Sequence, residues 1–298
     1  MERIYSQQVK KAANLAIFTA LLLILVKSFA WWQTSSVSML ASITDSMLDL
    51  LVSLMNMLIL RFALMPADHN HSFGHGKAEA LAGLGQSAFI SGSAVFILLQ
   101  GIHRLNTRQP LMNFQIGVFV TLFSILATAL LVIYQSKVIK QTGSPAIKAD
   151  KLHYQTDLLM NFTILISLSL SQLGYQQADA IFALLIAFYI LINAGKILFD
   201  NLQLLLDVAL PDEEIKSIEQ IILADKRILG FHDLKTRRSG AVRFIQFHLE
   251  LDDHMSFLQA HQITEDIENQ LRQRFSYTDI AIHQEPTSVV QVELKNLN

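Results

Sequence analysis

Four ionisable residues lie in apolar stretches of this sequence and form two matched pairs. Asp45 and Asp49 fall within SVSMLASITDSMLDLLVSLMNMLILRF, and His153 and Asp157 fall near the start of ADKLHYQTDLLMNFTILISLSL. Each pair is spaced i, i+4, so its two side chains project from one face of a helix. Because an ionisable group at the centre of a bilayer costs roughly 2.5–3.5 kcal/mol on insertion scales, residues retained there usually have a function.

Three carboxylates and one imidazole are a suitable ligand set for a divalent cation. Zinc takes four ligands in tetrahedral geometry from His nitrogen and carboxylate oxygen, and two helices that each supply a pair would complete such a site. Without the metal the carboxylates repel one another and favour protons, and His153 is the natural proton carrier near neutral pH. The pairs therefore predict a site that exchanges a metal ion for protons. The alternative is that the four residues are helix-end or interhelical hydrogen-bonding groups.

A second group of ligand types lies in PADHNHSFGHGKAE, residues 66–79, which follows the second apolar stretch. Asp68, His71 and His75 predict a more exposed metal site in this loop. Taken alone, a loop rich in histidine is also typical of solvated surface.

A third group lies in the C-terminal part of the chain. His283 and Glu285 are two residues apart on an expected strand and so share a face, and His248 lies on the polar face of its own strand, FIQFHLEL. These residues, with His232 and with His261 from a helix, are candidate ligands for metal on a sheet surface. Polar residues on solvent faces are the alternative.

Composition indicates a membrane protein. The chain of 298 residues is 52% hydrophobic and only 16% charged, against about 25% charged in soluble domains. A net charge of −2 gives no support for nucleic-acid binding. The chain has no cysteine, so a metal must be held by His, Asp, Glu or backbone oxygen.

Six apolar stretches are long enough to span a bilayer, the first of them a retained span rather than a cleaved signal. They cover residues 12–32, 37–64, 78–102, 114–136, 148–172 and 179–204. Lys and Arg are concentrated in the N-terminal arm and in segments 61–77 and 137–151, and Arg104 and Arg108 in an opposite loop are outnumbered. The positive-inside rule then places both termini in the cytoplasm.

Composition changes after Asp207, where a polar segment with mixed elements begins. We expect a helix at 211–225, strands at 231–238 and 242–251, a helix at 256–274 and a strand at 277–284. The predicted fold is an α-helical membrane protein, with a six-helix transmembrane domain at 1–208 and a cytoplasmic α+β domain at 209–298. Lys77 and Asp207 lie at expected membrane boundaries, either as an ion pair or as independent end residues.

The motifs TDSMLD, PADHNHSFGHGKAEAL, HYQTD, FHDLKTRRSG, FIQFHLEL and HQEP resemble the cation diffusion facilitator family over essentially the whole chain. The resemblance implies a homodimer in the lipid bilayer that exchanges cytoplasmic zinc (Zn²⁺), and also cadmium (Cd²⁺) or ferrous iron (Fe²⁺), for protons by alternating access. It also implies a metallochaperone-like fold for the C-terminal domain, which dimerises and is stabilised by metal.

The resemblance assigns roles to the same residues. It implies a transport site at Asp45, Asp49, His153 and Asp157, and a loop site at Asp68, His71 and His75. A binuclear cytoplasmic site is implied at His232, His248, His261, His283 and Glu285, where relatives commonly have Asp at the last position. Lys77 and Asp207 match a charge interlock near the membrane face of the dimer.

We therefore expect a proton-coupled exporter of divalent metal cations in the bacterial inner membrane, and not an enzyme. A membrane metallohydrolase would use the same ligands but needs an open coordination position for water. A metal sensor anchored by its spans would not need ligands within them. A passive channel would not need a proton gradient.

Overall fold

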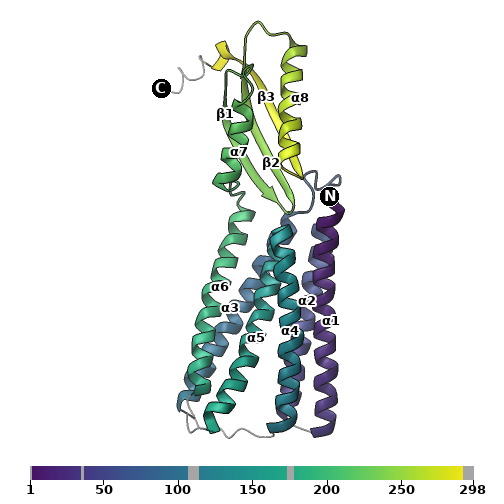
Figure 1. Ribbon diagram of the computed structural model, residues 1–298, viewed down its shortest axis with the longest axis vertical. Helices are drawn as coiled ribbons and strands as arrows, with labels where there is room; N and C mark the ends of the chain where they lie inside the picture. Colours follow the sequence, from purple (N-terminus) through teal and green to yellow (C-terminus); the bar gives the residue numbers. More distant parts are fainter. Residues whose placement is uncertain (1, 35–36, 107–113, 173–177, 291–298) are drawn as a thin grey trace. The chain divides into compact units, whose positions relative to one another are not determined.

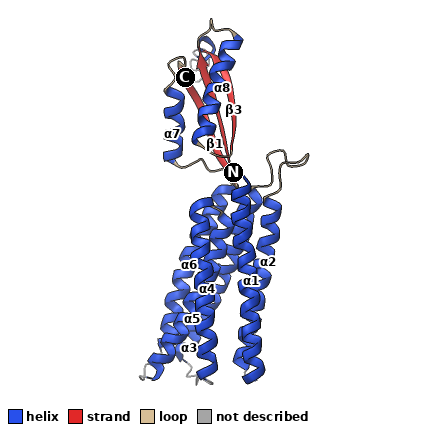
Figure 2. Cartoon of the chain, turned by 45° about the vertical axis from the view of Figure 1, so that its right-hand side comes forward, coloured by secondary structure: helices blue, strands red, loops and turns tan. Residues whose placement is uncertain are grey.

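The computed structural model describes residues 2–34, 37–106, 114–172 and 178–290. Contacts within the chain divide it into two compact units, one of residues Arg3–Leu202 and one that begins at Gln203. The first unit is built from helices, and the second contains the strands (Figures 1 and 2). The segments 107–113, which includes Arg108, and 173–177 lie outside the described residues.

Six long helices make up the described part of the first unit, and the last of them continues into the second unit. They begin and end within about ten residues of the predicted apolar stretches, and the largest difference is at the N-terminus. Their bounds are α1 Glu2–Thr34, α2 Val37–Ala63, α3 Lys77–Asn106, α4 Phe114–Thr142, α5 Pro145–Gln172 and α6 Ala178–Leu205.

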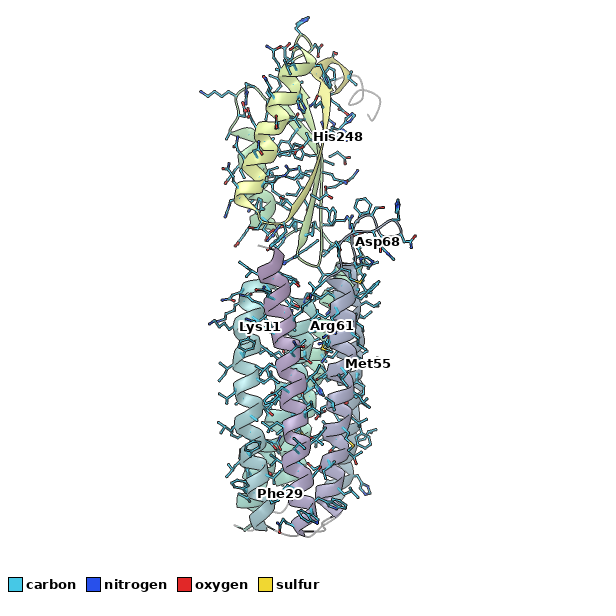
Figure 3. All side chains as sticks on the ribbon, turned by 90° about the vertical axis from the view of Figure 1, so that its right-hand side faces the viewer. Lys11, Phe29, Met55, Arg61, Asp68 and His248 are labelled. Atoms are coloured by element: carbon cyan, nitrogen blue, oxygen red, sulfur yellow. The ribbon has the colours of Figure 1, made fainter. Side chains whose placement is uncertain are left out.

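Large apolar side chains cover the outside of these helices. Phe29 on α1 and Met55 on α2 are 60% and 63% exposed (Figure 3). In water such a surface would be unfavourable, whereas lipid solvates it. Among the described residues, five of the helices are long and apolar enough to cross a membrane.

Helix α5 is the exception, because its first half carries charged and polar residues, including His153 and Asp157. It packs against α3, α4 and α2, so its polar half lies among other helices rather than at the surface of the bundle. Asp150 in this half is fully buried, and its carboxylate accepts hydrogen bonds from Gln86 (3.1 Å) and Gln135 (2.7 Å). Polar groups within a span are satisfied in this way by neighbouring helices.

The second unit has an α+β fold of two helices and a three-stranded sheet in the order β1-β2-β3. Strands β1 and β2 are antiparallel, and β2 and β3 are parallel, with α8 as the crossover that a parallel pair requires. The elements differ from the predicted ones by at most three residues at either end. Their bounds are α7 Asp212–Leu223, β1 Gly230–Ser239, β2 Val242–Leu251, α8 Phe257–Arg274 and β3 Thr278–Pro286.

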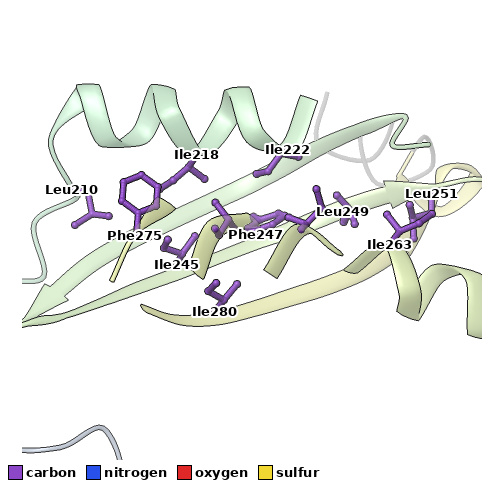
Figure 4. Close-up of a cluster of buried hydrophobic side chains, with 12 residues drawn as sticks. Leu210, Ile218, Ile222, Ile245, Phe247, Leu249, Leu251, Ile263, Phe275 and Ile280 are labelled. Atoms are coloured by element: carbon purple, nitrogen blue, oxygen red, sulfur yellow. The ribbon is translucent and has the colours of Figure 1, made fainter. Parts of the chain in front are cut away.

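One face of the sheet and the two helices form the core of this unit (Figure 4). Ile245, Phe247 and Leu249 alternate along β2 and pack with Ile218 of α7 and Ile267 of α8. All five side chains are at most 1% exposed. Because neighbouring residues of a strand point to opposite faces, His248 must lie on the face away from this core.

The ion pair predicted between Lys77 and Asp207 involves one residue of each unit, and it stays a prediction. Lys77 is the first residue of α3 in the first unit, and Asp207 follows α6 in the second. Within its own unit, Asp207 has a positive φ of 59° and its Oδ1 lies 3.5 Å from Nη1 of Arg237.

Candidate metal sites

Three groups of acidic and histidine side chains in the described residues bring their ligand atoms together. In each group the ligand atoms lie within 4.8 Å of one another. All nine residues were predicted as ligands from the sequence. The groups are Asp49, His153 and Asp157; Asp68, His71 and His75; and His232, His248 and Glu285.

The first group, the intramembrane cluster of Asp49, His153 and Asp157, lies between α2 and α5. His153 Nε2 is 3.1 Å from Asp49 Oδ1 and 4.0 Å from Asp157 Oδ2. The side chain of His153 is 9% exposed, and those of Asp49 and Asp157 are 21% and 31% exposed. Asp45 lies one turn before Asp49 on α2, but its side chain is exposed and lies outside this cluster.

The two helices of this cluster are joined by the residue after His153. The hydroxyl of Tyr154 on α5 lies 2.9 Å from Ser53 Oγ on α2 and donates to the carbonyl of Ala16 on α1 at 3.2 Å. Since that proton goes to Ala16, Ser53 donates to Tyr154. Tyr154 is 1% exposed, so these bonds are shielded from competing water. They fix the separation of α2 and α5 beside Asp49 and His153.

The second group, the loop cluster of Asp68, His71 and His75, lies between α2 and α3. Asp68 Oδ1 is 3.4 Å from His71 Nδ1, and Asp68 Oδ2 is 3.3 Å from His75 Nε2. The His75 side chain is 2% exposed, whereas those of His71 and Asp68 are 53% and 46% exposed. The ring of Phe62 packs edge-on against His75, with centroids 4.5 Å apart. The cluster is thus buried on one side and accessible on the other.

Backbone hydrogen bonds hold Asp68 in place. Its Oδ1 accepts from the amides of His71 at 2.7 Å and Asn70 at 2.9 Å. The bond from the His71 amide lowers the pKa of Asp68 below its usual value, with a smaller contribution from Asn70, so the carboxylate is ionised near neutral pH. Gly74, at φ +78°, makes the turn before His75. The loop therefore presents an anionic ligand in a fixed position.

The third group, the sheet cluster of His232, His248 and Glu285, is set by strand register. His232 of β1 pairs with His248 of β2, and His248 pairs with His283 of β3, so three histidines form a row across the sheet. Glu285 follows two residues later on the same face of β3. A β-bulge follows His232, between it and Lys235, where Asp233 has a φ of 52°.

The carboxylate of Glu285 reaches all three histidines of the row. Its Oε1 lies 2.8 Å from His248 Nδ1 and 3.4 Å from His283 Nε2, and its Oε2 lies 3.2 Å from His232 Nε2. Glu285 is 7% exposed. The side chain of Glu is thus long enough to contact each ring from this position.

Two residues near the sheet cluster differ from the prediction, one predicted as a ligand and one not. His261 on α8 is exposed and lies outside the cluster, because α8 directs Ile263 and Ile267 to the opposite, core face of the sheet. Glu250 was not predicted as a site residue, yet its Oε1 is 2.9 Å from His232 Nδ1. A carboxylate in this position fixes the tautomer of a histidine and leaves the other nitrogen for a metal.

Buried ligand atoms without a hydrogen bond occur in all three groups. In the described residues these atoms are His153 Nε2, His75 Nδ1, His248 Nδ1 and Glu285 Oε2. Three of these atoms, His153 Nε2, His248 Nδ1 and Glu285 Oε2, instead lie 3.1, 2.8 and 3.2 Å from another ligand of their own group. Buried polar atoms are normally satisfied by a partner, and here the nearest partners are the other candidate ligands. The remaining buried unpaired atoms are side-chain amide oxygens. Histidine nitrogen and carboxylate oxygen are also the ligands that zinc and similar ions take, so the donor sets fit such a metal.

Sequence reasoning also missed Lys27 on α1. Its ammonium donates to Ser46 Oγ at 2.7 Å and to the Ser42 carbonyl at 3.2 Å, both on α2. The signal was present, because Lys27 interrupts the apolar run ALLLILVKSFAWW just as Asp49 interrupts its own. Alternation along FIQFHLEL places Glu250 on the same face as His248. The contact of Glu250 with His232 could not be predicted, because it depends on the register of β1 against β2.

A bundle of apolar helices that encloses metal ligands, followed by a small α+β domain, defines a multi-span membrane transporter rather than an enzyme. The chain belongs to the cation efflux family, also called the cation diffusion facilitator family. Residues 13–206 match the cation efflux transmembrane domain, and residues 210–287 match the cation efflux protein cytoplasmic domain. The predicted family, fold class and absence of enzymatic activity are confirmed.

Relatives include the cation-efflux pump FieF of Yersinia pestis (strain Pestoides F) and that of Yersinia pseudotuberculosis serotype I (strain IP32953). Each is 49% identical over 293 residues, which cover 98% of this chain and 98% of the relative. Among solved structures, the metal-bound C-terminal domain of the CzcD transporter from Thermotoga maritima is 28% identical. It covers 26% of this chain and 94% of that chain, with a TM-score of 0.23.

Proposed function

We propose that this protein is a proton-coupled antiporter that exports divalent metal cations from the cytoplasm across the bacterial inner membrane. Zinc is the principal cargo, with cadmium or ferrous iron as further cargo. The observation that carries the proposal is the intramembrane cluster, in which Asp49, His153 and Asp157 converge between α2 and α5 and His153 Nε2 lies 3.1 Å from Asp49 Oδ1. The names of the FieF relatives, cation-efflux pumps, agree with it.

The same three side chains can bind either a metal ion or protons. The metal requires the carboxylates of Asp49 and Asp157 in their ionised form and a free lone pair on His153. Protons neutralise the carboxylates and occupy that lone pair, so the two cargoes exclude each other. Alternating access then follows if α2 and α5 expose the cluster first to the cytoplasm and then to the outside, with Asp45 as a fourth ligand in one of these states.

The other two clusters have supporting roles in this proposal. The sheet cluster holds structural zinc that stabilises a homodimer through the cytoplasmic domain, with His283 as a further ligand of a binuclear site. The loop cluster binds metal at the cytoplasmic side, where Asp68 supplies a fixed negative charge. Both termini are cytoplasmic, as the distribution of Lys and Arg indicates.

Transport by the purified protein in sealed vesicles tests this function. Zinc, cadmium, ferrous iron, manganese and magnesium are offered in turn, with and without an imposed pH gradient, and both metal flux and proton flux are followed. We expect saturable zinc flux that accelerates with an opposing proton gradient and is lost in Asp49→Ala. Metal flux independent of the proton gradient would indicate a channel, and normal flux in Asp49→Ala would place the transport site elsewhere.

A further inference from the structure

Lys27 lies within α1, five residues before the end of the apolar stretch 12–32, and its side-chain nitrogen is held by α2 instead of extending to the membrane surface. Lysines near helix ends usually extend toward the interface. Here the ammonium is held by α2, at 2.7 Å from the hydroxyl of Ser46 and 3.2 Å from the carbonyl of Ser42. Ser46 is 1% exposed, so the contact is shielded at that end.

The anchor of Lys27 lies among the proposed metal ligands. Ser46 is adjacent to Asp45 and three residues before Asp49 on α2. The Lys27 nitrogen is close enough to Asp49, Asp157 and Asp45 for their negative charges to offset part of the cost of burying its own charge. Among the described residues, its hydrogen bonds go to Ser46 and the Ser42 carbonyl, not to the oxygens of these carboxylates. Lys27 is therefore a fixed positive charge beside the intramembrane cluster and leaves its ligand atoms available.

A fixed charge in this position acts oppositely on the two states of the site. When no metal is bound, the ammonium attracts the carboxylates and offsets their mutual repulsion. When a divalent cation is bound, the ammonium repels it, and the repulsion is strong because few water molecules screen it. The same charge therefore stabilises the metal-free site and weakens the metal-bound one.

We propose that Lys27 is a resident counter-ion of the intramembrane carboxylates, which lowers the affinity of the site for divalent cations so that the bound ion can leave. Lys27 is a positioning residue in this scheme and does not ligate the metal. The inference rests on the proposed function, because it assigns metal binding to Asp49, His153 and Asp157. The competing role is mechanical, with Lys27 acting only as a hydrogen-bonded clamp between α1 and α2.

Two substitutions separate charge from clamp. Lys27→Gln keeps a hydrogen-bond donor, on a side chain one atom shorter, and removes the charge. Lys27→Met removes both the donor and the charge and keeps an unbranched apolar side chain in the helix. Lys27→Arg keeps the charge. Lys196→Gln is a matched control, because Lys196 is an exposed lysine within the apolar part of α6. All are made in the full-length protein with Asp68→Ala and His232→Ala, so that zinc binding reports the intramembrane site.

Zinc affinity in detergent and zinc flux in vesicles are measured for each variant. We expect Lys27→Gln and Lys27→Met to bind zinc roughly tenfold more tightly, as removal of one unit charge predicts. Their apparent KM and maximal transport rate should both fall because release is slower. The zinc affinities of Lys27→Arg and Lys196→Gln should remain within about twofold of the parent affinity, a difference of about 0.4 kcal/mol.

The inference is overturned if folded Lys27→Gln binds zinc with unchanged or weaker affinity. It is also overturned if Lys27→Gln behaves as the parent while only Lys27→Met is altered, since that pattern identifies a clamp. If Lys27→Met does not fold, Lys27→Gln and Lys27→Arg still decide between the two roles. Failure of the parent protein to bind or transport zinc would contradict the proposed function instead.

Discussion

Asp45 and Asp49 are both aspartates on α2, but their surroundings in the structure differ. Asp49 lies 3.1 Å from His153 Nε2, whereas Asp45, one turn away, is exposed and outside the cluster. Spacing alone treats the two as equivalent, because residues i and i+4 share a helix face. The difference predicts that Asp49 contributes more to metal binding than Asp45 does.

Substitution of each aspartate by asparagine tests this difference. Asp49→Asn should lower zinc affinity at the intramembrane site by at least about 100-fold, because loss of a partner that does not touch the metal already costs about 10–100-fold. Asp45→Asn should cost at most about tenfold, or about 1.4 kcal/mol. Equilibrium zinc binding to the full-length protein with the loop and sheet clusters removed measures both. Equal losses would show that the two carboxylates ligate the metal together.

The positions of the helices and strands around the sites depend on a few hydrogen bonds between neighbouring elements. Tyr154 joins α5 to α1 and α2 beside the intramembrane cluster. In the second unit, Arg243 of β2 donates to Glu214 of α7 at 2.7 and 3.1 Å and to the Ser276 carbonyl at 3.2 Å. Neither set of hydrogen bonds includes an atom of the proposed metal ligands, so each can be altered without removing a ligand.

Removal of the Tyr154 hydroxyl should loosen the intramembrane cluster. Tyr154→Phe leaves the Ala16 carbonyl and Ser53 Oγ without this partner, and we expect the free energy of unfolding to fall by about 1–3 kcal/mol. Zinc affinity should fall as well, but by less than in Asp49→Asn. Thermal unfolding in detergent, followed through Trp31 and Trp32, measures the stability, and Tyr134→Phe on α4 is the control. Unchanged stability and affinity would mean that other contacts set the α2–α5 separation.

The Arg243–Glu214 pair predicts a pH dependence for the second unit. Hydrogen bonds from Arg243 lower the pKa of Glu214 below its usual 4.5. Because the folded pKa is depressed, the stabilisation is complete above pH 4.5 and is lost as the pH falls through the lower folded value. Glu214→Gln should reduce stability near neutral pH by about 1 kcal/mol and should flatten this acid dependence.

Hydrogen exchange of the β2 amides in the full-length protein, corrected for intrinsic rates, measures this effect at each pH. Glu213→Gln, in the same turn of α7, is the matched control. An acid dependence that persists unchanged in Glu214→Gln would assign it to another carboxylate.

The sequence predicted the elements well, because apolar runs and strand alternation are local signals. It also predicted nine residues that the structure brings together in three clusters. What it could not supply was register and packing direction. The row His232–His248–His283 requires the pairing of β1, β2 and β3, and the position of His261 depends on which face of the sheet α8 covers. The contact of Lys27 with Ser46, next to Asp45, depends on the packing of α1 against α2, which the sequence does not show.

At the scale of the whole molecule, the chain combines a membrane unit and an α+β unit that both carry candidate metal sites. Only the intramembrane cluster is enclosed by apolar helices, among the sites that the described residues form. It is therefore the cluster suited to moving an ion across the bilayer, and the others are suited to stability or delivery. In the function proposed above, zinc and protons compete for Asp49, His153 and Asp157.

The pH dependence of zinc affinity at the intramembrane cluster tests that claim most directly. It is measured by equilibrium binding between about pH 5.5 and 7.5, where histidine changes its charge, in protein with Asp68→Ala and His232→Ala. We predict that affinity falls steadily as the pH is lowered and that each zinc ion bound releases protons to the buffer. A zinc affinity that is constant over this range, with no proton release, would contradict the account.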